Sequence, residues 1–89
     1  MKHIRITVSG KVQGVFFRKY TDLKAKELGI NGMVKNLFDG SVYIEAEADE
    51  EILKSFVEWC YRGSPASGVK DVKVEEGELK WYKDFKITG

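Results

Sequence analysis

The chain has 89 residues, of which 43% are hydrophobic and 33% are charged, and its formal net charge at pH 7 is +1. This length supports one ordinary hydrophobic core, so we expect a single folded domain over residues 1–89 rather than a disordered chain. The near-zero net charge argues against general nucleic-acid binding, and the single cysteine excludes an intramolecular disulfide or a multi-cysteine zinc site.

No apolar stretch reaches the roughly 18 residues of a membrane-spanning helix, and the first ten residues alternate in polarity instead of forming a secretory signal. We therefore expect a cytoplasmic protein that binds no membrane, and we expect it to be a monomer. Basic residues gather near the N-terminus, where residues 1–21 include five Lys or Arg and no acid. A small anion would find its most favourable surroundings there.

The first predicted element is a strand. Ile4, Ile6 and Val8 alternate with polar residues, which indicates a strand with one buried face. The alternation breaks at residues 10–14, GKVQG, where two glycines stand four positions apart.

A helical pattern follows over residues 17–28, and Gly29 suits the position just after a helix. Residues 32–36 predict a second strand. Residues 37–40, LFDG, predict a turn, because the Asp-Gly pair tolerates positive φ. The alternation over residues 42–48 predicts a third strand.

A second helix is predicted over residues 50–62, with Asp49 as its N-cap. A loop is expected over residues 63–68, a fourth strand around residues 72–74 and a short last strand over residues 85–87. The charged connection between these strands carries no clear pattern.

The order β-α-β-β-α-β, with a short extra strand at the C-terminus, predicts an α+β fold of the ferredoxin-like type. Both helices would cover one face of a mainly antiparallel sheet. This fold occurs in enzymes, RNA-binding proteins and regulatory domains, so it does not decide function.

The start of the first helix has no residue suited to cap it. Val15, Phe16 and Phe17 offer no side-chain oxygen to the free N–H groups, and an anion would satisfy these groups well. Gly10 and Gly14 would let the backbone turn tightly around such an anion.

Arg18 follows this loop, and its guanidinium group could hold a phosphate through two parallel hydrogen bonds. The loop is not a Walker motif, because no Gly-Lys-Ser/Thr follows, and it lacks the third glycine of a dinucleotide-binding motif. The alternative reading is an ordinary loop with a surface arginine.

Few residues offer acid–base or nucleophilic chemistry. His3 lies on an early strand, and Cys60 lies on an apolar helix face that we expect to be core. Glu45 and Glu47 share one face of a strand, which we expect to be solvated. By position alone, Asn36 is a turn residue. No metal-ligand cluster is visible beyond these carboxylates, so an enzyme of this sequence would depend on positioning and electrostatics without a titrating base or a metal.

Two segments resemble the signatures of the acylphosphatase family. Residues 8–18, VSGKVQGVFFR, resemble the first signature at every defining position. Residues 32–36, GMVKN, followed by Gly40 and Val42, resemble the second, and the closing Phe-x-Ile over residues 85–87 is also similar.

The resemblance spans nearly the whole chain, with two departures. Met33 stands where an aromatic residue is usual, and Ala48 stands where a glycine is usual. Both are structural positions rather than positions of the chemistry.

The resemblance implies that small acyl phosphates are hydrolysed to a carboxylate and inorganic phosphate, which also acts as an inhibitor, without a metal, a cofactor or a covalent intermediate. It implies that the Arg18 side chain binds the phosphate oxygens and that Asn36 holds the attacking water. The phosphate would also be bound by backbone N–H groups of Gln13, Gly14, Val15, Phe16, Phe17 and Arg18.

Two other functions share this fold. An RNA-binding module would need exposed aromatic residues on its first and third strands, where this chain offers Tyr43 beside Glu45 and Glu47. A regulatory module that binds phosphate without turnover would not need both Arg18 and Asn36.

Overall fold

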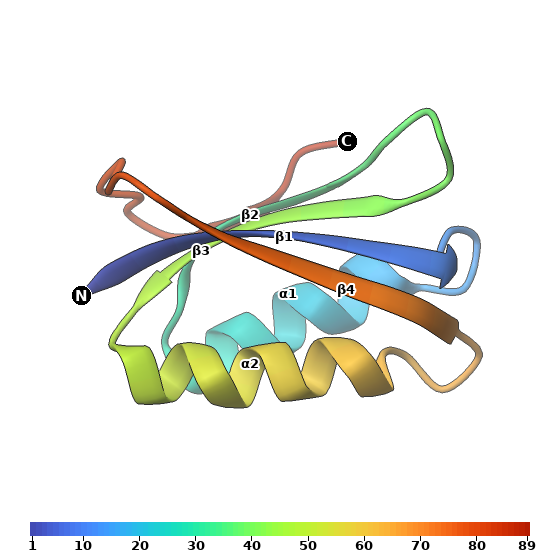
Figure 1. Ribbon diagram of the computed structural model, residues 1–89, viewed down its shortest axis with the longest axis horizontal. Coiled ribbons are helices and arrows are strands. Elements are labelled where there is room, and N and C mark those ends of the chain that lie inside the picture. The colour runs from blue at the N-terminus through green and yellow to red at the C-terminus, as the bar shows by residue number, and fades with distance from the viewer.

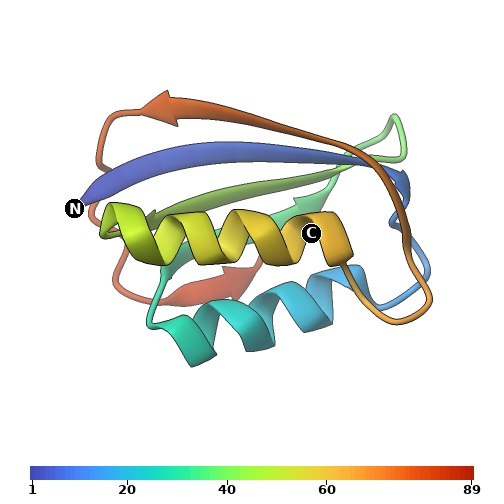
Figure 2. The ribbon, with the colours of Figure 1, turned by 60° about the horizontal axis from the view of Figure 1, so that its bottom comes forward.

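The computed structural model describes residues 1–89 as two helices and five strands. The elements are β1 (Lys2–Lys11), α1 (Phe17–Leu28), β2 (Asn31–Asn36), β3 (Val42–Ala48), α2 (Glu50–Arg62), β4 (Gly68–Gly77) and β5 (Phe85–Ile87). The strands form one sheet in the order β4-β1-β3-β2-β5, which Figure 2 shows from β4 at the top to β5 at the bottom. Only the β2–β5 pair is parallel. The prediction of a ferredoxin-like α+β fold is confirmed.

Both helices cover the same face of the sheet, as predicted (Figure 1). The alternating side chains Ile4, Ile6 and Val8 of β1 are buried there, together with Phe17 of α1 and Phe56 of α2. Each such burial contributes about 1.5–3 kcal/mol, which explains why the period-2 and helical patterns were sufficient to predict the layers. Neither helix has the length and hydrophobicity needed to cross a bilayer.

Strand β1 runs further than its alternation predicts. It continues to Lys11 because a bulge at Gly10 keeps it paired with β4. Gly10 has φ of +120°, and a Cβ atom there would lie 2.3 Å from the carbonyl oxygen of Gly68. Gly10 therefore serves the sheet rather than an anion turn, which corrects the expectation above. Gly68, expected in a loop, begins β4 for the same reason.

The C-terminal end of α1 is capped as predicted, but the N-terminal end of α2 is not. Gly29 has φ of +72° and its N–H bonds to the carbonyl groups of Ala25 and Lys26, as expected for the end of α1. Asp49 occupies the N-cap position of α2, but its side chain makes no capping hydrogen bond. Its carboxylate lies 3.6 Å from the amino group of Met1 instead.

Residues 79–82, here called the strap, cover part of the sheet face opposite the helices. The carboxylate of Glu47 accepts hydrogen bonds from the backbone N–H groups of Lys80 at 2.6 Å and Tyr82 at 3.0 Å. The two N–H groups converge on one carboxylate because Trp81, between them, has φ of +58°. The strap is therefore fixed to β3 through its backbone.

Side chains complete this buried cluster. Glu45 accepts hydrogen bonds from the hydroxyl groups of Tyr43 and Tyr82, both at 2.8 Å, and lies 2.9 Å from Nζ of Lys80. His3 lies 2.7 Å from Glu47 through Nδ1 and stacks on the Tyr82 ring.

The predicted solvated face at Glu45 and Glu47 is thus wrong, since these residues are only 6% and 2% exposed. Burial acts to raise the pKa of both carboxyl groups, but the hydrogen bonds outweigh it. Bonds from Lys80 and the two tyrosines lower the pKa of Glu45 to about 2. The pKa of Glu47 is also lowered, chiefly by the Lys80 backbone N–H.

Candidate active site

The loop between β1 and α1 is fixed by three buried side chains. Val12, Val15 and Phe17 are buried in the core. Gly14 and Phe16, between them, have positive φ angles of 74° and 61°. The left-handed residues between these buried anchors turn the backbone tightly, so the structure confirms that Gly14 is a turning residue.

The backbone N–H groups of residues 13–18 donate no hydrogen bond within the chain. Phe16 occupies the N-cap position of α1 without a side-chain cap, as predicted, and its carbonyl group accepts the N–H of Tyr20 at 3.1 Å. Free donors at the positive end of a helix dipole are suited to bind an anion. We call these N–H groups the cradle.

The structure brings Arg18 and Asn36 together. Arg18 is the second residue of α1, and Asn36 is the last residue of β2. The guanidinium Nη1 of Arg18 and the backbone N–H of Asn36 both donate to the backbone oxygen of Gly89, the latter at 3.1 Å. One oxygen acceptor therefore joins two residues that lie 18 positions apart in the sequence.

The side-chain oxygen of Asn36 is the only buried side-chain N or O atom without a hydrogen-bond partner. A buried unpaired acceptor costs about 1–3 kcal/mol of stability. An acceptor that the fold leaves free is suited to a ligand or a bound water. It is unlike an ordinary turn residue, whose side chain would bond to its own backbone.

Gln13 connects the cradle to the β2–β3 turn. Its Nε2 donates to the carbonyl groups of Leu37 and Ser41, both at 2.8 Å. Asp39 closes the same turn by accepting the N–H of Ser41 at 3.0 Å. Gln13 thereby holds the end of the Asn36 strand against the loop. Figure 2 shows the loop and the turn at the same end of the sheet.

Sequence reasoning missed this side-chain role of Gln13 and two further contacts. Buried Ser64 donates through Oγ to the carbonyl group of Val15 at 2.8 Å, which ties the α2–β4 loop to the cradle. Gly89 joins Arg18 to Asn36, as described above. None of these contacts has a local sequence signal, because each joins segments far apart in the chain.

The remaining reactive side chains lie elsewhere. Cys60 is fully buried, as predicted, and burial raises the pKa of its thiol to about 12. His3 is buried against Glu47 on the strap side of the sheet. No group of three His, Cys, Asp or Glu side chains is placed to hold a metal ion.

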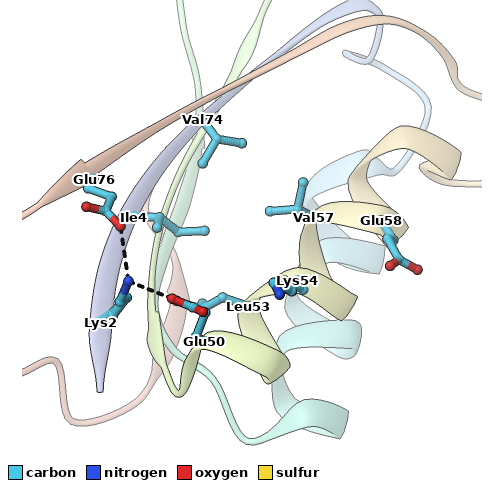
Figure 3. Close-up of a pocket in the computed structure, with 9 residues that line it drawn as sticks. All are labelled: Lys2, Ile4, Glu50, Leu53, Lys54, Val57, Glu58, Val74 and Glu76. Carbon is cyan, nitrogen blue, oxygen red and sulfur yellow. Dashed lines mark hydrogen bonds and ion pairs between the residues drawn. The ribbon is translucent and has the colours of Figure 1, made fainter.

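A separate groove of about 440 Å³ lies between α2 and the first and fourth strands (Figure 3). Ile4, Leu53 and Val57 form part of its apolar wall, and Lys2 closes one end by pairing with Glu50 at 2.6 Å. The groove lies near the start of β1, whereas the cradle follows its end, so the groove is not part of the candidate site.

Comparison with known proteins agrees with this geometry. A family model described as Acylphosphatase matches residues 4–87. An acylphosphatase of Shewanella amazonensis is 45% identical over 89 residues, covering 99% of this chain and 98% of that protein. One of Thermotoga maritima is 48% identical over 87 residues, covering 98% and 97%. The crystal structure of acylphosphatase from Bacillus subtilis is similar over 100% of both chains, with 43% identity and a TM-score of 0.97.

Proposed function

Because the chain belongs to the acylphosphatase family and hydrolyses acyl phosphates to a carboxylate and inorganic phosphate, we propose that the reaction takes place between the cradle, Arg18 and Asn36. The observation that carries this proposal is the free side-chain oxygen of Asn36, a residue whose backbone N–H shares the Gly89 acceptor with the Arg18 guanidinium.

In this proposal the cradle and Arg18 hold the phosphate group. The N–H groups of residues 13–18 have no partner within the chain, so they need not break a bond to receive phosphate oxygens. Gly89 accepts from one nitrogen of the Arg18 guanidinium, and the other N–H groups are available for the anion. Donors fixed in advance stabilise charge on the equatorial oxygens without reorganising.

Asn36 positions the attacking water. Its free oxygen accepts a hydrogen bond from the water, which directs a lone pair of the water oxygen towards phosphorus. The new P–O bond forms as the bond to the acyl oxygen breaks, in line with the attack. The electron pair leaves with the carboxylate, and the protons of the water remain on the phosphate product or pass to solvent.

This chemistry needs no strong acid or base. A carboxylate is a good leaving group because its conjugate acid has a low pKa, near 4. The guanidinium and the amides neutralise charge, which a metal ion does in many other phosphoryl-transfer enzymes. We therefore propose hydrolysis without a metal ion.

The test is the loss of ultraviolet absorbance of benzoyl phosphate with purified protein, with and without a chelator. We expect the same rate in both. Loss of activity with chelator, restored by magnesium or zinc, would contradict the metal-free mechanism. Phosphate binding without turnover would instead support the regulatory module.

A further inference from the structure

Two phenylalanines stand out on the surface of the site. Phe38 is fully exposed and Phe16 is 73% exposed, which makes them the most exposed large apolar side chains in the molecule. Phe16 lies in the cradle, and Phe38 lies in the turn that Gln13 holds against the cradle. Both rings therefore belong to the two segments that form the proposed site.

Phe16 is also held in an unfavourable backbone conformation. Its φ of +61° is in the left-handed region, which costs a bulky residue of order 1–3 kcal/mol and which Gly or Asn adopts more readily. The neighbouring side chains Val15 and Phe17 are buried, so the core fixes this turn without using the Phe16 ring. The ring contributes nothing to the core, yet it is presented to solvent two residues before Arg18.

We propose that the Phe16 ring contacts the acyl group of the substrate, so that the enzyme prefers acyl phosphates with an apolar group of aromatic size. This inference rests on the proposed function. The phosphate is bound at the N–H groups on either side of Phe16, so a substituent leaving the cradle passes close to this ring.

In-line geometry distinguishes the two rings. The leaving acyl oxygen must lie opposite the attacking water. The water is on the side of Asn36, and Phe38 follows Asn36 by two residues on the same strand end and turn. The acyl group therefore departs on the side away from that turn, which assigns the contact to Phe16 and leaves Phe38 as a matched control.

The test compares kcat/KM for benzoyl phosphate and acetyl phosphate in the wild type, Phe16→Ala, Phe16→Leu and Phe38→Ala. Contact between two aromatic rings predicts that Phe16→Ala lowers the benzoyl-to-acetyl ratio about two- to tenfold. Phe16→Leu should lower it less, and Phe38→Ala should leave it unchanged. Any general damage to the cradle affects both substrates and cancels in the ratio.

A binding measurement covers variants with little turnover. Calorimetric titration with benzoylphosphonate and acetylphosphonate, which cannot be hydrolysed in the same way, should show the same change of ratio. An unchanged ratio in Phe16→Ala, or a fall in Phe38→Ala instead, would overturn the proposal. A wild type that hydrolyses neither acyl phosphate would contradict the proposed function, and the phosphonate ratio would still test the Phe16 contact.

Discussion

Among the single residues of the site, Arg18 makes two interactions. It donates to the backbone oxygen of Gly89, and in the proposed mechanism it also binds the phosphate. Asn36 is held by its backbone N–H to the same oxygen, while its side chain stays free. Asn36 is thus positioned through its backbone, whereas Arg18 is positioned through one nitrogen of the same guanidinium that is proposed to bind the phosphate.

Arg18→Lys should lower kcat/KM for benzoyl phosphate on the order of 10²–10³-fold and weaken phosphate inhibition, because lysine keeps the charge but loses the paired N–H donors. Loss of the bond to Gly89 should cost only about 1 kcal/mol of unfolding free energy. Steady-state kinetics and urea unfolding measure both. Lys19→Ala, at the exposed neighbouring position, is the control for net charge. Near-normal phosphate inhibition in Arg18→Lys would place the anion elsewhere.

Asn36→Ala should separate chemistry from binding and from stability. We expect kcat to fall on the order of 10²-fold, while the phosphate inhibition constant changes by no more than about threefold, since the water matters only on the way to the transition state. The unfolding free energy should not fall, because the deleted oxygen has no partner. Asn36→Asp should be no more active, since its charge repels the phosphate.

The outcomes for Asn36 are distinct. If Asn36→Ala keeps the wild-type kcat, Asn36 is only a turn residue and does not position the water. A loss of phosphate affinity equal to the loss of kcat would make it part of the cradle.

At the scale of elements, the strap is held to β3 by two buried carboxylates, and its stability should depend on acid. The pKa of Glu45 lies at about 2 in the folded protein against an ordinary value of 4.5. Its stabilisation is therefore complete above pH 4.5 and is lost as the pH falls towards 2. A pKa shift of this size corresponds to about 3 kcal/mol of unfolding free energy.

Glu45→Gln should remove most of the loss of unfolding free energy that protonation of Glu45 causes between pH 4.5 and 2. Glu75→Gln, on the exposed part of β4, should not remove it. Urea unfolding at pH 7, 4.5, 3 and 2 measures it. If Glu45→Gln loses stability with acid as steeply as the wild type, Glu45 does not provide the acid-sensitive attachment of the strap.

Gln13 is the other attachment between elements. Gln13→Ala leaves the carbonyl groups of Leu37 and Ser41 without this donor, so we expect about 1–2 kcal/mol less unfolding free energy and about tenfold lower kcat/KM. Lys11→Ala, at the exposed end of β1, is the control. Unchanged kcat/KM in Gln13→Ala would show that the turn holds its place without Gln13.

The elements themselves could be predicted because their patterns are local. The alternation from Ile4 to Val8 and the uncapped start at Phe16 each follow from adjacent residues. The sequence does not reveal that Glu45 and Glu47 are buried, because their partners in the strap lie more than 30 residues away in a segment without periodicity. An alternating pair of carboxylates has the same sequence pattern whether water or a strap covers it.

The candidate site was predictable in part for the same reason. The residues point to an anion loop near Arg18, but by position Asn36 resembles any turn residue, and only the family resemblance assigns it a role. The contact that joins them passes through Gly89, which is 53 positions beyond Asn36. Tertiary contacts of this kind leave no local sequence pattern.

At the scale of the whole molecule, the proposed site and the apolar groove lie at opposite ends of β1. The cradle follows Lys11, and the groove is lined by Lys2 and Ile4. The proposed site combines one loop, one helix start, one strand end and Gly89 at one end of the sheet, where the backbone N–H groups of residues 13–18 have no partner within the chain.

In the proposed mechanism, a water positioned at this end of the sheet attacks phosphorus rather than the acyl carbon. Hydrolysis of benzoyl phosphate in water enriched in oxygen-18, followed by mass spectrometry of both products, tests it directly. We expect one labelled oxygen in the inorganic phosphate and none in the benzoate, because the bond between phosphorus and the acyl oxygen is broken. Label in the benzoate would show attack at the carbonyl carbon and would contradict the roles given to the cradle and Asn36.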